Sequence, residues 1–290
     1  LSGVRLQVSH LKTSGSRNWY KVKNIKTIID RAIDEGIDIT CDRYPYIAAA
    51  TDLDVILPNW VYEGGIADQI NRLKDTNTRQ QIAKEVSQSE DNGFWNGIMI
   101  SSVYYDKNKW MEGKTITEIS KELNKPPIET VFDLLIEEET RVDIFLFSMC
   151  EENLEEILGW DFVFVGSDSS MRANQGILKE GKPHPRSYGT FSRILGRFYR
   201  EKKLLSLEKA IQKMTGLPAQ KIGLDKRGLI KTGYFADITI FDPEKIIDRS
   251  TFTEPHQYSE GVEYVIVNGK IAVNNGKHTG ITNGRILRKS

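Results

Sequence analysis

The sequence predicts an α/β fold, in which parallel strands alternate with helices, followed by a small antiparallel β subdomain. Residues 4–9 read as a strand, residues 22–35 place apolar side chains on one helical face, and residues 37–40 read as the next strand. Further along, Asn268-Gly269 lies between two apolar segments, and both residues accept the positive φ of a tight hairpin turn. Parallel strands joined through helices imply a sheet or barrel with helices outside.

The next part of the chain interrupts and then resumes this alternation. Residues 53–94 are less regular, with an amphipathic helical stretch near 66–87, and we interpret them as an insertion. Beyond it the pattern predicts strands at 98–103, 142–148 and 161–166, and helices near 115–124, 127–139, 151–159, 188–202 and 206–220. The rhythm of strand followed by helix therefore extends to about residue 222.

The pattern changes after Gly233. Residues 236–241 read as a strand that Asp-Pro ends, and the hairpin around Asn268-Gly269 follows. We therefore expect a first domain over residues 1–223 and a small β subdomain over residues 224–290.

The composition excludes several classes of function. The 290 residues include 40 basic and 40 acidic side chains, so no global field attracts nucleic acid or an anionic membrane. Apolar runs such as 144–147 are far too short to cross a bilayer. Two cysteines make no disulfide framework, and a reduced, cytoplasmic setting is the simpler interpretation. Because residue 1 is Leu and a strand begins by residue 4, we expect a chain that starts inside a longer fold.

Polar side chains follow several of the predicted strands. In parallel α/β folds the reactive groups lie at the C-terminal ends of the strands, where the variable loops gather. The residues at such positions are His10 and Lys12 after the first strand, Tyr44 after the second, Cys150 after the strand at 142–148 and Asp168 after the strand at 161–166. These side chains can therefore face one site.

His10 and Asp168 each have two interpretations. A lone histidine is more often structural, but imidazole is also the commonest neutral metal ligand, and a strand end favours that role. Asp168 either caps the next helix or serves a reaction, because a carboxylate at a strand end can bind a metal, deprotonate a water and protonate a leaving amine. The residue types alone leave both pairs of alternatives open.

Lys12 and Arg186 are typical of solvated charges, yet a substrate carboxylate needs such donors, and arginine supplies a planar fork that suits it. His184 stands between two prolines and is expected to shape a rigid loop. His256 and His278 fall in the β subdomain and are expected to be structural. The sequence contains no Gly-rich phosphate loop, no Cys-x-x-Cys and no Gly-x-Ser-x-Gly elbow, so the usual serine hydrolase motif is missing.

A series of motifs, taken together, resembles a known family. They are Val8-Ser9-His10-Leu11-Lys12, Asp42-Arg43-Tyr44-Pro45-Tyr46, Val165-Gly166-Ser167-Asp168, the segment from Pro183 to Phe191, the segment from Lys213 to Ala219, Gly233-Tyr234-Phe235-Ala236-Asp237 and Val265-Ile266-Val267-Asn268-Gly269. In this order they resemble the N-acyl-D-amino-acid deacylases, or D-aminoacylases, of the amidohydrolase superfamily. The resemblance covers nearly the whole chain but corresponds only to the C-terminal portion of the family's chain.

The resemblance implies a fold and a role for each site residue. The chain would be the C-terminal part of a TIM-like (β/α) barrel, from about strand six onward, beside a small β domain. His10 resembles a zinc ligand, and Asp168 resembles the residue that binds metal and activates the attacking water. Lys12, Tyr44 and Arg186 match positions that hold the substrate carboxylate. The implied reaction is zinc-assisted attack of hydroxide on the acyl group of a small N-acyl-D-amino acid, with Asp168 passing the proton to the departing nitrogen.

The sequence also departs from this family. The family needs a His-x-His pair, a metal-binding Cys and a further His, whereas the four His of this chain form no His-x-His. A catalytic zinc requires about three protein ligands, so we expect zinc to bind this chain alone weakly or not at all. The segment 48–60 holds no Arg or Lys, which favours a small or apolar substrate side chain, and the loop 169–182 is longer than usual.

Two other functions remain open at this point. One is a different amidohydrolase, such as a dihydroorotase-like cyclic amidase or a dipeptidase. The other is a non-catalytic remnant or binding domain. The presence of Lys12, Tyr44 and Arg186 together favours the deacylase.

Overall fold

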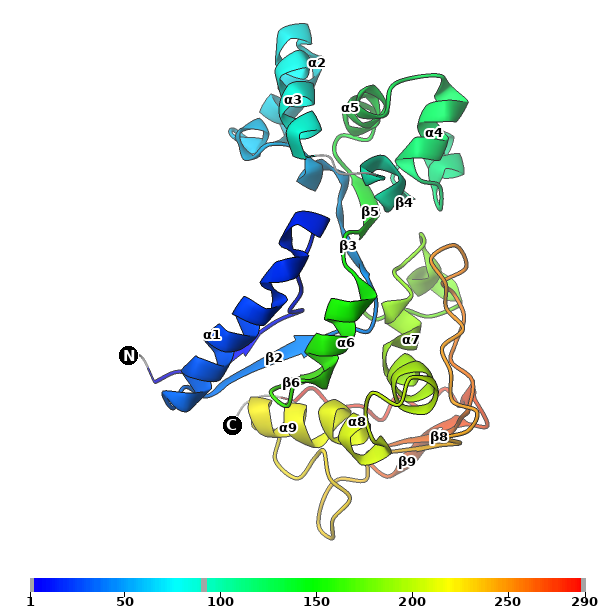
Figure 1. Cartoon of the computed structure of the whole chain (residues 1–290). Helices are drawn as coiled ribbons and strands as arrows, with labels where there is room; N and C mark the ends of the chain where they lie inside the picture. Colours follow the sequence, from blue (N-terminus) through cyan, green and yellow to red (C-terminus); the bar gives the residue numbers. More distant parts are fainter. Residues whose placement is uncertain (1–2, 90–92, 288–290) are drawn as a thin grey trace.

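The computed structural model describes residues 3–89 and 93–287, and its elements are shown in Figure 1. Residues 1–2, 90–92 and 288–290 lie outside the described residues. The start of the expected first domain, the end of the expected β subdomain and a short part of the expected insertion are therefore not described.

A three-stranded parallel sheet carries the strand ends on which the site depends. It consists of β1 (Leu6–Val8), β2 (Ile39–Arg43) and β6 (Val163–Val165), in the order β1-β2-β6. The register pairs Val8 with Cys41 and Arg43 with Val165, so the three strands end close together. Helix α1 (Val22–Asp34) joins β1 to β2, which confirms the predicted βαβ unit.

Helix α1 covers the outer face of this sheet because its apolar side chains repeat on one side. Val22 and Ile29 are buried in a cluster with Cys41 and Val163. Cys41 therefore serves as a small buried side chain, as free cysteines often do. The helix ends at Asp34 with Glu35 as its C-cap, and Gly36 follows with φ 83°, a left-handed conformation that glycine adopts readily after a helix.

A second, antiparallel sheet differs from the prediction. It contains β3 (Ala48–Asp52), β4 (Ile98–Val103) and β5 (Val142–Phe147), in the order β3-β5-β4. The expectation that the strands at 98–103 and 142–148 continue the parallel series is wrong, because both pair antiparallel and β3 joins them. The interruption of the parallel pattern therefore extends over 48–147. Pairing direction depends on contacts far apart in the sequence, which periodicity does not reveal.

Helices gather on this antiparallel sheet at one end of the molecule (Figure 1). They are α2 (Ile66–Lys74), α3 (Thr76–Ser89), α4 (Ile116–Leu123) and α5 (Pro127–Glu137). Leu53, Ile100, Phe132 and Ile144 are fully buried in the core between helices and sheet. Thr115 and Glu118 form a capping box that starts α4.

A second group of helices packs beside the parallel sheet. It comprises α6 (Glu151–Gly159), α7 (Arg186–Arg193), the π-helix η7 (Ile194–Glu201), α8 (Leu207–Met214) and α9 (Gly216–Ile222). Leu154, Ile194 and Phe198 form part of their shared core. The helix predicted near 188–202 thus begins two residues earlier and widens to a π-helix. The one predicted near 206–220 breaks at Thr215, whose φ of −131° and ψ of −80° are not helical.

Short 3-10 turns complete the helical elements. They are η1 (Ser16–Lys21), η2 (Leu53–Ile56), η3 (Asn59–Tyr62), η4 (Phe94–Gly97), η5 (Asp106–Met111) and η6 (Gly176–Lys179). Over the described ranges, no helix is long and apolar enough to cross a membrane.

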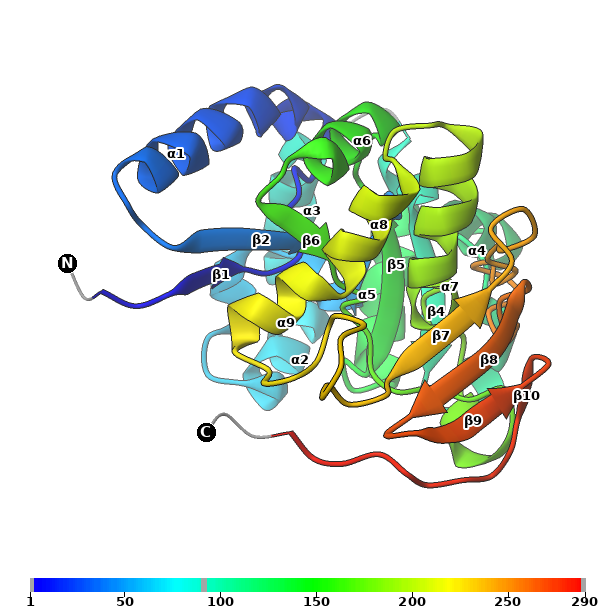
Figure 2. The ribbon, with the colours of Figure 1, turned by 90° about the horizontal axis from the view of Figure 1, so that it is seen from below.

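The last sheet is a four-stranded antiparallel unit on the side of the molecule opposite α1 (Figure 2). It contains β7 (Ile238–Phe241), β8 (Val262–Val267), β9 (Lys270–Asn274) and β10 (Lys277–His278) in the order β10-β9-β8-β7. Asn268 and Gly269 connect β8 to β9 with φ values of 47° and 79°, so the predicted hairpin is confirmed. The connection between β7 and β8 runs back over α7, and Ser259 Oγ there contacts Ser192 Oγ.

Candidate functional site

Two residues at the ends of parallel strands adopt an unusual backbone conformation. His10 follows β1 with φ 44°, and Asp168 follows β6 with φ 47°. A positive φ is uncommon for residues with a side chain and often marks a functional position, where the surrounding structure compensates for the strain. The backbone N–H of His10 donates to Asp42 Oδ1 at 2.8 Å, which anchors the turn to β2.

Lys12 lies directly beside His10. Its Nζ is 2.8 Å from His10 Nδ1 and donates to the His10 carbonyl at 3.1 Å. Burial, together with the nearby charge of Arg43, lowers the pKa of Lys12 to about 8. The first strand end therefore holds an imidazole and an ammonium group in contact.

Asp168 and Arg186 form the second pair. Arg186 Nη1 lies 3.0 Å from Asp168 Oδ2, and the Asp168 side chain is 37% exposed whereas that of Arg186 is 10% exposed. Arg186 is the first residue of α7, so the helix start places its guanidinium group next to the end of β6. The pair thus combines an accessible carboxylate with a largely buried guanidinium group.

Tyr44 lies between these groups. Its ring centroid is 4.6 Å from Arg186 Cζ and 5.9 Å from Lys12 Nζ, and the residue is 1% exposed. The structure therefore brings Lys12, Tyr44 and Arg186 together, with Asp168 beside them. The Arg43 guanidinium group is a further neighbour, 4.2 Å from the same ring.

A cavity of about 290 Å³ opens at Asp168 and Arg186 and extends over the antiparallel sheet. Its far wall includes Asp52 and Asp143, which face each other across β3 and β5, and Arg172 from the loop 169–182. The absence of Arg and Lys from 48–60 therefore does not determine the charge of the pocket, because Arg172 in a more distant loop supplies a cation. A small or apolar substrate side chain remains a prediction.

His184 holds the start of α7 in place. It is 4% exposed, its Nδ1 accepts from the Arg186 backbone N–H at 3.0 Å, and its Nε2 lies 3.0 Å from the Ala48 carbonyl. Burial lowers its pKa to about 3, so the ring is neutral and donates through Nε2. Tyr46 and Phe252 pack against it edge-on. The expected role of His184 in shaping a rigid loop agrees with these contacts.

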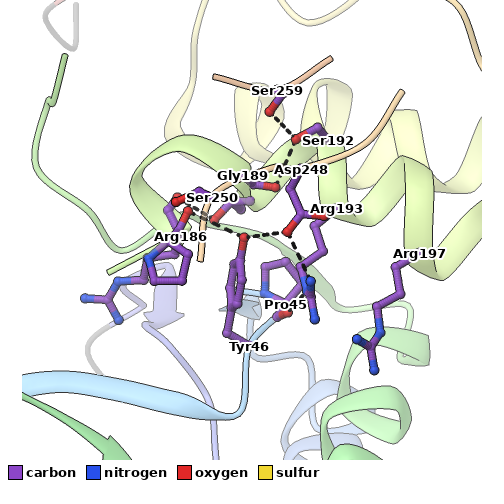
Figure 3. A network of polar contacts seen from close by, with 12 residues as sticks. Pro45, Tyr46, Arg186, Gly189, Ser192, Arg193, Arg197, Asp248, Ser250 and Ser259 are labelled. Atoms are coloured by element: carbon purple, nitrogen blue, oxygen red, sulfur yellow. Dashed lines mark hydrogen bonds and ion pairs between the residues drawn. The ribbon is translucent and has the colours of Figure 1, made fainter. Parts of the chain in front are cut away.

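A polar network links α7 to Tyr46 and Asp248 and so helps to hold this helix in place (Figure 3). Asp248 Oδ2 accepts from Arg193 Nη1 at 3.0 Å and from the Tyr46 hydroxyl at 3.3 Å. Gly189 allows this approach, since a Cβ there would lie 2.5 Å from Tyr46 Oη. In Figure 3 the Arg186 side chain points away from this network. Its Nη1 pairs instead with Asp168 Oδ2.

Cys150 does not belong to the series of parallel strand ends. It follows β5, which is antiparallel, and it forms the N-cap position of α6. Burial raises the pKa of its thiol. The expectation that it faces the same site rested on the wrong pairing direction of β5.

His256 and His278, in the C-terminal part of the chain, both make local contacts. His256 contacts the Gly181 carbonyl at 2.9 Å through Nε2, and the Nδ1 of His278 accepts from the Gly280 N–H at 3.0 Å.

The chemistry of His10 and Asp168 suits two ligands of a zinc ion, an imidazole nitrogen and a carboxylate oxygen. A catalytic zinc has about three protein ligands and an open position. Among the residues that the structure describes, no group of three or more His, Cys, Asp or Glu side chains could hold a metal ion. The donor types of His10 and Asp168 therefore fit two positions of a zinc site, and the described residues do not complete one.

Comparison with known proteins identifies the family of this chain. Residues 60–273 match the model of the amidohydrolase family. The chain belongs to the amidohydrolase family. It is 31% identical to the N-acyl-D-glutamate deacylase of Alcaligenes xylosoxydans xylosoxydans over 99% of its own length and 49% of that protein.

Solved amidohydrolase structures share the fold of this chain. A D-aminoacylase with a binuclear metal centre superposes with a TM-score of 0.75 at 29% identity, over 99% of this chain and 50% of that one. The N-acyl-D-glutamate deacylase of Bordetella bronchiseptica, in complex with zinc and a phosphonate mimic of the tetrahedral intermediate, gives a TM-score of 0.74 at 27% identity. That match covers 98% of this chain and 49% of that one. The chain thus spans about half the length of the relatives it matches.

Two cations of this candidate site could not be identified from the sequence. Arg43 lies within a motif that was noted for Tyr44, and only its burial distinguishes it. Arg172 lies in a loop without regular pattern, and only the fold places it near Asp143. The available signal for Arg43 was its place at the end of a strand predicted to be half buried, because arginine is rarely buried in proteins.

Proposed function

We propose that the full-length protein hydrolyses the amide bond of N-acyl-D-amino acids and releases a D-amino acid and a carboxylate. The observation that carries this proposal is the grouping of Lys12 and Arg186 around the Tyr44 ring, next to Asp168. The first three side chains offer hydrogen-bond donors, which suits an α-carboxylate. A substrate carboxylate held there would lie beside the carboxylate of Asp168.

The proposed role of Asp168 is that of general base and then general acid. Its side chain is the more exposed member of its ion pair with Arg186, so a water and a substrate can reach it. Asp168 would accept a proton from the attacking water and pass it to the departing nitrogen. His10 and Asp168 would hold zinc together with ligands outside the described residues, and bound zinc would polarise the acyl carbonyl and the water.

The proposed architecture of the whole protein follows from the three parallel strands. We propose that β1, β2 and β6 form an arc of a TIM-like barrel, with His10 at the end of its sixth strand. Residues 1–223 would then be barrel and inserted antiparallel sheet, and residues 224–290 a small β subdomain. The C-terminal ends of barrel strands are where catalytic residues gather, which agrees with the positions of His10, Tyr44 and Asp168.

The substrate class is tested by the rates of hydrolysis of matched compounds. The full-length protein, loaded with zinc, should hydrolyse N-acetyl-D-amino acids much faster than their L enantiomers, and a chelator should abolish this activity. Cyclic amides and dipeptides test the other amidohydrolase reactions. Preference for a cyclic amide or a dipeptide would replace the proposed function, and no hydrolysis of any of them would favour a binding domain.

A further inference from the structure

Arg43 is a buried cation that the proposed reaction does not yet use. It is the last residue of β2 and is 1% exposed. Its Nη2 donates to the Tyr46 carbonyl at 2.7 Å and lies 2.9 Å from Met149 Sδ. Its Nε and Nη1 are buried with no hydrogen-bond partner. The Arg43 guanidinium group is therefore desolvated, and its hydrogen bonds to the protein do not replace those that it would form with water.

Packing alone does not account for the charge at this position. Burial lowers the pKa of Arg43, which means that the surroundings disfavour its charged form. The face of the Tyr44 ring supports the guanidinium group at 4.2 Å, but a cation–π contact offsets only part of the cost of desolvation. Charged groups that are buried without a partner are rare in proteins, and they gather at functional sites.

The other two cations near Tyr44 already have partners. Arg186 is paired with Asp168 at 3.0 Å, and Lys12 contacts His10 Nδ1 at 2.8 Å. Arg43 forms no ion pair with any residue that the structure describes, and unlike Lys12, which also forms none, it is fully buried and has two nitrogens without a hydrogen-bond partner. Its charge is therefore the least compensated of the three, and it acts from a site where little water screens it.

We infer that Arg43 is a positioning residue for the substrate carboxylate. Its guanidinium group holds the Tyr44 ring in place and puts a buried positive charge behind that ring. This inference rests on the proposed function. Arg43 lies against the Tyr44 ring, so it acts through the position of Tyr44 and through the potential it creates. Arg43 therefore strengthens the binding of a substrate with a carboxylate and has almost no influence on the binding of a neutral one.

The test compares two substrates on variants of the full-length protein. The substrates are an N-acetyl-D-amino acid and the same compound with its carboxylate converted to a primary amide. Arg43→Gln removes the charge and keeps a polar side chain of similar length. Arg43→Lys keeps the charge but loses the planar group that stacks on Tyr44. The matched control is Arg227→Met, because Arg227 also stacks on an aromatic ring, at 4.3 Å from Phe235, away from the site.

Arg43→Gln should lower kcat/KM for the carboxylate about tenfold, mainly through a higher KM, and change the amide less than about threefold. Arg43→Lys should recover most of the preference for the carboxylate, and Arg227→Met should leave that preference unchanged. Equal losses for both substrates in Arg43→Gln, or an unchanged preference, would overturn the inference and make Arg43 structural. If Arg43→Gln does not fold, Arg43→Met and Arg43→Lys supply the same comparison.

The two proposals fail in different ways. If wild-type protein shows no preference for the carboxylate over the amide, the proposed function fails. If wild type shows the preference, and Arg186→Met loses it while Arg43→Gln retains it, only the role of Arg43 fails.

Discussion

Arg186 Nη1 lies 3.0 Å from Asp168 Oδ2, so the guanidinium group proposed to bind the substrate is paired with the carboxylate proposed to act as base. Lys12 and His10 stand in a similar relation, with Nζ 2.8 Å from Nδ1. Two of the three proposed carboxylate binders thus contact a residue proposed for the reacting centre. A change to one member of a pair alters the surroundings of the other, and such effects are not additive.

Replacement of Asp168 tests the proposed base. Asp168→Asn in the full-length protein should keep the fold and lower kcat by two to four orders of magnitude, because general base catalysis typically contributes about 10²–10⁴-fold. The measurement is the steady-state rate with an N-acetyl-D-amino acid. Asp34→Asn, at the exposed end of α1, is the matched control. A loss of less than about tenfold in Asp168→Asn would mean that Asp168 only shapes the turn after β6.

The βαβ unit and the hairpin could be predicted because their signals are local. Helix α1 follows from apolar side chains on one face, and the turn at Asn268-Gly269 follows from two residues that accept positive φ. The antiparallel pairing of β3, β4 and β5 could not be predicted, because it depends on contacts between segments far apart in the chain. Cys150 was placed with the site for the same reason.

The site shows the same division between local and long-range information. His10, Tyr44 and Asp168 lie shortly after the ends of β1, β2 and β6, so the rule for strand ends selected them as candidates from the sequence. The contact of Arg186 with Asp168 depends on where α7 begins, and His184 sets that position through its bond to the Arg186 N–H. Burial and cation–π contacts, which a single sequence does not display, are what single out Arg43.

Zinc binding to the 290-residue chain alone is expected to be weak. In the proposed site, His10 and Asp168 would supply only two of the three ligands that a catalytic zinc usually requires. Dialysis against a metal buffer, followed by metal analysis, should leave well below one zinc per chain. Stoichiometric zinc that resists dialysis would show that this assignment of ligands is wrong. His10→Ala then tells whether His10 takes part in whatever site exists.

Asp143 should make stability depend on pH. It lies opposite Asp52 on paired strands, and burial together with the Asp52 charge raises its pKa. Between the ordinary pKa and this raised one, the folded state binds more protons, so stability falls as pH rises through that interval. The destabilisation is complete above the raised pKa. Asp143→Asn should therefore stabilise the protein at pH 7 by about a few tenths of a kcal/mol, the lower end of the range for cross-strand pairs, because Asp143 is exposed and solvent screens its charge.

Urea unfolding at several pH values measures this effect. The gain from Asp143→Asn should shrink as pH falls from 7 toward 4, since protonation already removes the charge from the wild type. Asp52→Asn should give a similar gain, and the double variant should gain less than the sum because the repulsion is shared. A gain that is the same at all pH values would show that the charge of Asp143 is not its cause.

The last prediction concerns how the substrate carboxylate is held. Arg186→Met should lower kcat/KM for N-acyl-D-amino acids by about tenfold to a few hundredfold, because charge-assisted hydrogen bonds contribute roughly 1.5–3 kcal/mol each. Arg186→Lys keeps the charge but loses the bidentate fork, so it should also lower kcat/KM. The loss should be much smaller for the analogue with a neutral amide in place of the carboxylate. Equal losses for the two substrates would mean that Arg186 acts only on the fold, through Asp168 and the start of α7, and would remove the main support for this substrate class.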